Sequence, residues 1–450
     1  MDFDFSEDQE QLRDAVRKWV EKGYDFERRR AIVAAGGFDR AAYGELAELG
    51  LGGLTIAEAD GGLGMGPVEG MVVMEELGRG IVLEPFAQTL IASAVIGTHG
   101  DDALRAAWLP RIASGEALVV LAQQERGARY RLEQCKATAS GSGHALTVSG
   151  AKSLVPAGDQ ADAFIVPAML DGSLALFVVA RDATGVRTSG YLTQDGSRAA
   201  ELVLDKAPAQ LLTTDGLAGL ELGVDVGIAA TCAEAVGVMD RTLAITVEYM
   251  NTRKQFGVAI ASFQALRHRV ADMKMQLELA RSMSYYATLK LGAPAGERRQ
   301  ALSRAKVQLG QSMRFVGQQA VQLHGGIGVT DEYIVSHYFK KLTQMEICFG
   351  DTLHHLGEVS ARMEDTAGVF AYPRRDVPPP LRSRAATGAR GAAASTPSSS
   401  SSAPRHRLRP VTRPSRSGGR SGSSRTPAAP DGPWTAPQPP VARPWQRFAA

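Results

Sequence analysis

Cysteine is scarce in this 450-residue sequence, and long uncharged apolar runs are missing. The three cysteines, Cys135, Cys232 and Cys348, form no CxxC pair. A disulfide framework, a zinc ribbon and a thioredoxin-type motif are therefore excluded. The most apolar stretch, residues 223–239, is interrupted by two acidic side chains, whereas a bilayer-spanning helix needs about 20 apolar residues. We expect a reducing, cytoplasmic setting and no membrane partner.

Basic residues are missing from the first eight positions, four of which are acidic. A secretory signal or transit peptide carries positive charge there. We therefore expect the protein to stay where it is made.

Lysine is absent from residues 373–450, although this segment contains 14 arginines, two acidic residues and 15 of the 22 prolines. The first 372 residues have 36 basic and 46 acidic side chains, so a mildly acidic body carries a basic tail. The Pro/Ser/Arg/Gly composition predicts a disordered tail, because it buries too little apolar surface to offset chain entropy. Basic tails can bind nucleic acid, but we expect no nucleic-acid partner and assign the tail no function.

Several catalytic motifs are absent from the body. There is no Gly-x-Ser-x-Gly elbow, no GxxxxGK[ST] loop and no HExxH pair. The adjacent His354 and His355 point to different faces of a helix, so we expect no metal site.

Hydrophobic periodicity divides the body into three parts. Ser6 and Gln9 form a capping-box signal, and helical patterns over 40–49 and 69–77 predict a helical domain from residue 1 to 117. Short apolar runs bounded by Gly, Asp or Pro then predict strands of an antiparallel, barrel-like module over 118–212, at residues 118–122, 145–148, 163–166, 174–179 and 202–204. No helical segments separate these strands, so this module is not a Rossmann domain.

The helical period returns after this module. Long segments predict a helical bundle over 213–372, with helices at residues 224–250, 263–291, 298–323, 331–341 and 345–363. The expected fold class is α+β, mainly α: a helical domain, a β module, a four-helix bundle and the tail 373–450.

Two motifs of the bundle have an ordinary structural interpretation as helix ends, because basic residues and glycines commonly terminate helices. Their combination indicates more. Arg253-Lys254-Gln255-Phe256-Gly257, then Gln264, then Gln322-Leu323-His324-Gly325-Gly326-Ile327-Gly328, in this three-part order, resembles the acyl-CoA dehydrogenase family over about residues 1–368. Glu48-Leu49-Gly50-Leu51, Gly61-Gly62-Leu63-Gly64 and Glu75-Glu76-Leu77-Gly78-Arg79 also match.

The resemblance implies an FAD flavoprotein of fatty acid metabolism that removes two hydrogens from an acyl-CoA. A carboxylate takes the α proton, the β hydrogen leaves as hydride to the flavin, and an electron-transfer flavoprotein commonly accepts the electrons. Such a site must also stabilise the enolate oxygen and exclude water.

The resemblance also implies residue roles. Arg253 would bind the FAD pyrophosphate, where a guanidinium can contact two oxygens. Gln255, Phe256 and Gln264 would contact the adenosine half, and Gln322, Gly325 and Gly326 would let the nucleotide approach the backbone. In the family these groups serve an FAD shared between neighbouring subunits, so we expect an oligomer such as a tetramer.

The family's usual base lies in an aromatic-Glu-Gly-Thr stretch, which here reads Phe349-Gly350-Asp351-Thr352. Asp351 is therefore the candidate base. Its backbone N–H is the candidate donor to the thioester oxygen. Thr352 is a candidate cofactor-binding residue. Some members keep the base on an earlier helix, at a position that corresponds to Gly227.

The β module also departs from the family pattern. Gln124-Glu125-Arg126 replaces Thr-Glu-Pro, and Leu154-Val155-Pro156-Ala157-Gly158 replaces Trp-Ile-Thr-Asn-Gly, which leaves Gln124 as the candidate flavin contact. These features resemble the small subunits of two-subunit, pimeloyl-CoA dehydrogenase-type enzymes. Two hypotheses follow: a competent dehydrogenase, as a homo-oligomer or a heterotetramer with a related large subunit, or a structural subunit that completes its partner's FAD site. The branch suggests a dicarboxylic, branched or bulky acyl-CoA.

Overall fold

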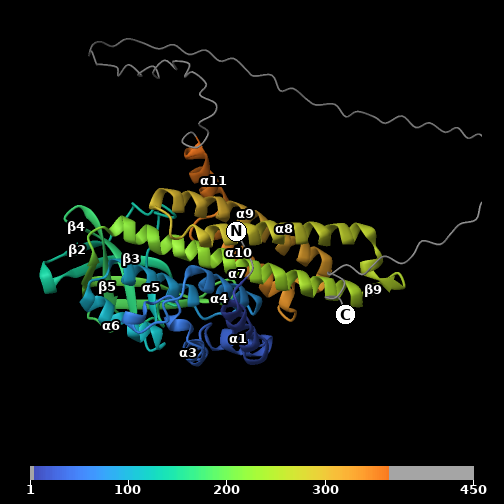
Figure 1. The fold of residues 1–450 in the computed structure, drawn as a ribbon, viewed down its shortest axis with the longest axis horizontal. Helices are drawn as coiled ribbons and strands as arrows, with labels where there is room; N and C mark the ends of the chain where they lie inside the picture. The colour runs from blue at the N-terminus through green and yellow to red at the C-terminus, as the bar shows by residue number, and fades with distance from the viewer. Residues whose placement is uncertain (1–4, 364–450) are drawn as a thin grey trace, which may run out of the picture. The chain divides into compact units, whose positions relative to one another are not determined.

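The computed structural model describes residues 5–363, which belong to one compact unit (Figure 1). The tail prediction for 373–450 lies outside the described residues. Six helices open the chain: α1 (Glu7–Gly23), α2 (Phe26–Ala35), α3 (Arg40–Glu48), α4 (Pro67–Arg79), α5 (Phe86–His99) and α6 (Asp102–Ala113). The predicted capping box begins α1, where the Gln9 N–H donates to Ser6 Oγ (3.2 Å) and the Ser6 N–H donates to Gln9 Oε1 (3.0 Å).

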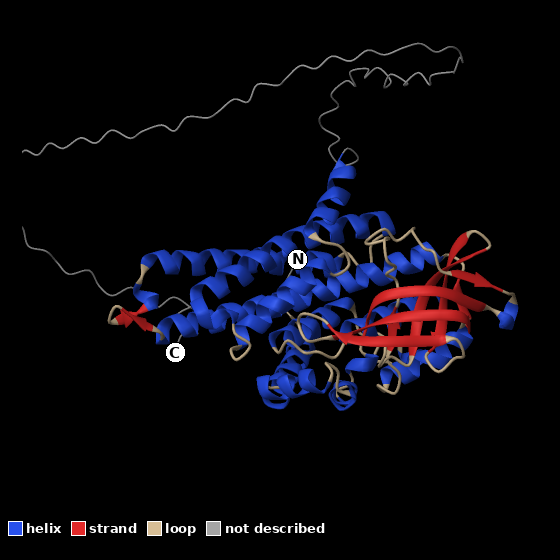
Figure 2. Cartoon of the chain, turned by 180° about the vertical axis from the view of Figure 1, so that it is seen from behind, coloured by secondary structure: helices blue, strands red, loops and turns tan. Residues whose placement is uncertain are grey.

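Eight strands form one sheet, which lies at one end of the unit beside the helices (Figure 2). They are β1 (Val119–Leu121), β2 (Thr138–Ser140), β3 (Thr147–Pro156), β4 (Ala163–Leu170), β5 (Ser173–Ala180), β6 (Val186–Leu192), β7 (Arg198–Pro208) and β8 (Gln210–Thr213). The order is β6-β7-β3-β2-β4-β5-β8, with β1 added beside β4. Most pairings are antiparallel as predicted, but β1–β4 and β2–β4 are parallel. The long connections that lead to β4 permit these parallel pairings.

The bundle consists of five helices and a small hairpin. They are α7 (Gly216–Thr252), the β9–β10 hairpin (Lys254–Gln255 and Val258–Ala259), α8 (Gln264–Leu289), α9 (Ala295–His324), α10 (Ile334–Ile347) and α11 (Thr352–Ala361). Met345, predicted to open the last helix, instead lies in α10, because the turn at 348–351 separates two helices that share an apolar pattern.

Helix α7 is the central element of the unit. It packs against α4, α5, α8, α9 and α10, so it is apolar around most of its circumference. It is the one helix among residues 5–363 long and apolar enough to cross a membrane, but 83% of its most apolar window is buried inside the protein. The composition of α7 is thus explained by its place in the core.

Candidate active site

The predicted adenosine-binding residues lie at one end of the bundle. The β9–β10 turn places Phe256 and Gly257 at φ 53° and 81°, the two positive values of a type I′ hairpin. Phe256 is 92% exposed, and its ring meets the Phe263 ring edge to face at 6.2 Å between centroids. A bulky, exposed ring held in left-handed backbone is typical of a binding group rather than of a stabilising one.

The second predicted group lies beside this hairpin. Helix α9 ends at Gly325 (φ 64°), and a Cβ at Gly325 or Gly326 would meet no atom within 4 Å. The Tyr249 ring on α7 stacks on His324 at 4.4 Å, and its hydroxyl donates to the His324 carbonyl (3.3 Å). The structure thus brings the two motifs together. The seven residues predicted to bind the cofactor at this end are all exposed: Arg253, Gln255, Phe256, Gln264, Gln322, Gly325 and Gly326.

The remaining predicted site residues lie far from this end. Gln124 lines a cavity between the β module and the bundle, together with Asp225 on α7 and Phe349. Asp225 lies near the start of α7, and Arg253 caps its end 28 residues later. This separation corresponds to about 40 Å along the helix. One dinucleotide cannot reach both ends of a single chain, so this geometry suits an FAD shared between neighbouring chains.

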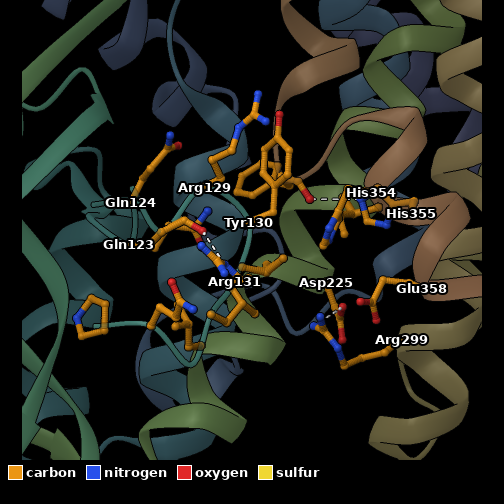
Figure 3. A pocket seen from close by; sticks show the side chains of 18 of the residues that line it. Gln123, Gln124, Arg129, Tyr130, Arg131, Asp225, Arg299, His354, His355 and Glu358 are labelled. Carbon is orange, nitrogen blue, oxygen red and sulfur yellow. Dashed lines mark hydrogen bonds and ion pairs between the residues drawn. The ribbon is translucent and has the colours of Figure 1, made fainter. Parts of the chain in front are cut away.

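The cavity itself is nearly filled by side chains. Its free volume is about 30 Å³, with Tyr130, Phe349 and His354 among the residues that line it (Figure 3). The Tyr130 ring lies 5.1 Å from the His354 ring. Sites for cofactor-sized ligands usually measure about 300–1,000 Å³. The exposed end of the bundle, with Arg253, Gly325 and Gly326, has room for the nucleotide half of FAD, whereas the filled cavity does not fit an isoalloxazine ring.

Neither family position for the base presents a carboxylate to this cavity. A Cβ at Gly227 would lie 2.6 Å from the Phe349 ring, and a Cβ at Gly350 would lie 2.5 Å from His355 Nε2. Asp351 is not among the cavity-lining residues. It is the N-cap of α11, where its Oδ1 accepts the His354 N–H (2.8 Å). The assignment of Asp351 as a base stays a prediction.

The turn that carries Asp351 is held by one buried lysine. Phe349 and Gly350 have φ values of 56° and 116°. The fully buried Lys306 ammonium donates to the carbonyls of Met345 (3.0 Å), Glu346 (2.8 Å) and Gly350 (2.9 Å), and burial lowers the pKa of Lys306.

The side chains after this turn are already engaged within the protein. The Thr352 hydroxyl donates to Glu346 Oε1 (2.6 Å), so its hydroxyl proton is already used. His355 contacts the Phe349 carbonyl (3.1 Å) and the Ser303 hydroxyl (3.3 Å). Burial lowers the pKa of His355 to about 3.

A buried ion pair supports Gln124 from the β module. Glu125 Oε1 accepts Lys152 Nζ (2.7 Å) and the Ala137 N–H (3.1 Å), while its Oε2 accepts the Lys136 N–H (2.8 Å). The Gln124 carbonyl accepts the Ser153 N–H (2.8 Å). These bonds fix where the 124–136 loop leaves and re-enters the sheet.

Sequence reasoning missed Asp225 and Tyr130 as residues of the cavity. Asp225 is a buried carboxylate whose oxygens accept Arg298 Nε (2.7 Å) and an Arg299 N–H (3.2 Å), and burial raises its pKa. Tyr130 belongs to a loop without periodicity. The sequence shows only that Asp225 interrupts an apolar helix. Its partners Arg298 and Arg299 lie more than 70 residues away, so the sequence gives no signal for the pairing.

Comparison with known proteins identifies the class that this architecture represents. The family model "Acyl-CoA dehydrogenase, N-terminal domain" matches residues 6–116, and "Acyl-CoA dehydrogenase, C-terminal domain" matches residues 215–364. Acyl-CoA dehydrogenase FadE12 of Mycobacterium tuberculosis is 30% identical over 348 residues, which cover 74% of this chain and 89% of FadE12. This chain belongs to the acyl-CoA dehydrogenase family, which comprises oxidoreductases that act on acyl-CoA.

Two solved assemblies share the fold over most of the chain. A variant of the Tcur3481-Tcur3483 steroid ACAD has a TM-score of 0.75 and 29% identity, covering 80% of this chain and 99% of that one. The ChsE4-ChsE5 complex from Mycobacterium tuberculosis has a TM-score of 0.74 and 27% identity, covering 81% and 99%. An FAD-dependent dehydrogenase is also similar, at 25% identity and a TM-score of 0.73.

Proposed function

We propose that this chain takes part in FAD-dependent α,β-dehydrogenation of an acyl-CoA thioester as the non-catalytic subunit of a heteromeric enzyme. It completes the FAD site of a related large subunit, which supplies the base. The observation that carries the proposal is the Asp351 carboxylate, which caps the α11 N-terminus. Both family base positions are glycines, Gly227 and Gly350.

The exposed end of the bundle provides this chain's contribution. Arg253 suits the pyrophosphate, because a guanidinium can bind two phosphate oxygens, and the open backbone at Gly325 and Gly326 allows close approach of a nucleotide. Arg253, Gly325 and Gly326 would hold the nucleotide half of FAD, and the bound flavin would supply the hydride acceptor for the β hydrogen. Two of the similar solved structures, Tcur3481-Tcur3483 and ChsE4-ChsE5, are named for two different proteins each. This supports a heteromeric partner for this chain.

The substrate of the pair is best described by class. One of the similar structures is named a steroid ACAD, and a steroid is a bulky molecule. This name favours a bulky acyl-CoA over a short linear one. Electron-transfer flavoprotein as electron acceptor and a cytoplasmic location remain predictions for the assembled enzyme.

Co-expression with a related acyl-CoA dehydrogenase chain as candidate large subunit tests the proposal. We expect this chain alone to purify without flavin and the pair to contain one FAD per two chains. Arg253→Ala should weaken FAD retention by at least about tenfold, because a bidentate phosphate contact is lost. Arg187→Ala, an exposed arginine on β6, is the matched control and should change nothing.

Substitution of Asp351 then decides which chain carries the base. Anaerobic mixing of the pair with acyl-CoA bleaches the oxidised flavin, and Asp351→Asn in this chain should alter the bleaching rate by no more than a factor of about two. Loss of bleaching with FAD retained would instead assign the base to Asp351 and reject the non-catalytic role.

A further inference from the structure

One loop of the β module closes the cavity described above. Residues 126–135 connect β1 to β2 and contribute Tyr130, Arg131 and Leu132 to the lining. Figure 3 labels Tyr130 beside His354, which is a residue of α11. The two rings lie 5.1 Å apart at an interplanar angle of 47°. The loop therefore reaches across the cavity and packs against the bundle.

The space that this contact leaves is very small. About 30 Å³ remains, and a single water needs about 10–15 Å³ measured in this way. The opposite wall cannot retreat, because Phe349 already packs against the α7 backbone at Gly227. A planar three-ring group enters only if the loop moves.

The loop is built to hold its position. The Ala128 N–H donates to the Glu125 carbonyl (3.2 Å), and the Arg131 N–H donates to the Ala128 carbonyl (3.2 Å). The Arg131 guanidinium donates to the Gly127 carbonyl (3.2 Å). Because the Glu125 carboxylate also binds the backbone of Lys136 and Ala137, it ties the two ends of the loop together, as in a compact Ω-loop.

A second contact fixes the loop to the bundle. Leu132 packs against the main apolar core, while Arg129, with φ 49°, adopts left-handed backbone beside Tyr130. A non-glycine residue in this region costs energy that the surrounding structure must offset. The conformation thus places the tyrosine ring in the cavity at the expense of local strain.

We infer that residues 126–135 form a built-in plug and that Tyr130 is the residue that excludes the flavin ring from this chain's own cavity. This inference deepens the proposed function and rests on it: the chain contributes an adenosine-binding end to its partner while keeping its own ring site closed. A pair of chains then carries a single flavin, because one of its two ring cavities is blocked sterically.

Riboflavin is a suitable probe, because it has the flavin ring without the adenosine half that a neighbouring chain would bind. Its fluorescence is titrated with the full-length chain alone. The opened variant replaces Arg129, Tyr130 and Arg131 together by glycine. We expect it to bind riboflavin at least about tenfold more tightly than the wild type, since the plug no longer occupies the cavity.

Three further variants make the result specific. Tyr130→Phe keeps the ring and should behave as the wild type. Tyr191→Ala removes a part-buried tyrosine elsewhere in the β module and should also change nothing. Val224→Phe, added to the opened variant, refills the cavity wall and should abolish the gained binding. Circular dichroism and thermal unfolding establish that each variant is folded.

A folded opened variant that binds riboflavin no better than the wild type overturns the inference. So does a wild type that already binds as tightly as the opened variant. Both outcomes leave the proposed function to its own test, because flavin bleaching by the Asp351→Asn pair does not depend on riboflavin binding to this chain alone.

Discussion

At the scale of single residues, burial rather than identity decides what the ionisable groups near the cavity can do. Asp351 carries a carboxylate, as a catalytic base would, but this carboxylate accepts the His354 N–H as the cap of α11. His355 lies at the start of the same helix, but it is buried between the Phe349 carbonyl and Ser303. Desolvation disfavours its charged form and lowers its pKa to about 3. The histidine is therefore a neutral structural group at physiological pH.

The pKa of His355 predicts an acid sensitivity. An ordinary histidine has a pKa of 6.5, so between about pH 6.5 and 3 the unfolded chain binds a proton at this position that the folded chain does not. The free energy of unfolding should therefore fall with falling pH, by up to about 1.4 kcal/mol per pH unit. His355→Gln should reduce this slope in urea titrations. His268→Gln, at an exposed histidine on α8, should leave it unchanged, and equal slopes in all three proteins would contradict the prediction.

At the scale of elements, the turn between α10 and α11 shows how one long side chain sets a backbone. Lys306 on α9 donates to three carbonyls at the end of α10 and in the turn. The carbonyls of Met345 and Glu346 lie in the last turn of α10, where helix carbonyls lack intrahelical donors, and Lys306 supplies donors to them. Lys306 is thus the group that holds Gly350 and Asp351 in their observed orientation.

Replacement of this lysine should loosen the turn. Lys306→Met keeps the apolar stem but leaves buried acceptors unpaired, and we expect the free energy of unfolding to fall by about 2–4 kcal/mol. Hydrogen exchange at the Asp351 and Thr352 amides should accelerate in the same variant. Lys274→Met removes an exposed helix pair with Glu278 and should cost no more than about 0.5 kcal/mol. A loss as small for Lys306→Met would mean that the turn is held by other contacts.

At the scale of the whole molecule, a buried arginine joins the three predicted parts. Arg29 on α2 donates to the Ile81 carbonyl (2.9 Å) and to the Asp195 carbonyl in the β6–β7 turn (2.5 Å), and it contacts His337 Nδ1 on α10 (3.3 Å). The helical domain, the β module and the bundle thereby share one polar node. This node helps explain why residues predicted as three segments form one compact unit.

Removal of the node should uncouple the parts. Arg29→Met leaves two buried carbonyls without a donor, so we expect a loss of about 3 kcal/mol and a broadened or split calorimetric transition, because cooperativity between the parts decreases. The neighbouring Arg30 is half exposed and interacts with Glu27 and the Phe26 ring on its own helix, so Arg30→Met is the matched control. A single, equally sharp transition in both variants would show that apolar packing alone couples the three parts.

Sequence by itself determined the order of helices and strands, the capping box at Ser6 and the motifs at Arg253 and Gln322, because periodicity, capping and short motifs are local properties of the chain. Tertiary structure alone decided the parallel pairings of β4, the direction of Asp351 and the position of Tyr130. These depend on contacts between distant segments, such as Tyr130 with His354 and Gly227 with Phe349. A loop without periodicity has no local signal for its conformation, so only packing against the bundle showed that the cavity is closed.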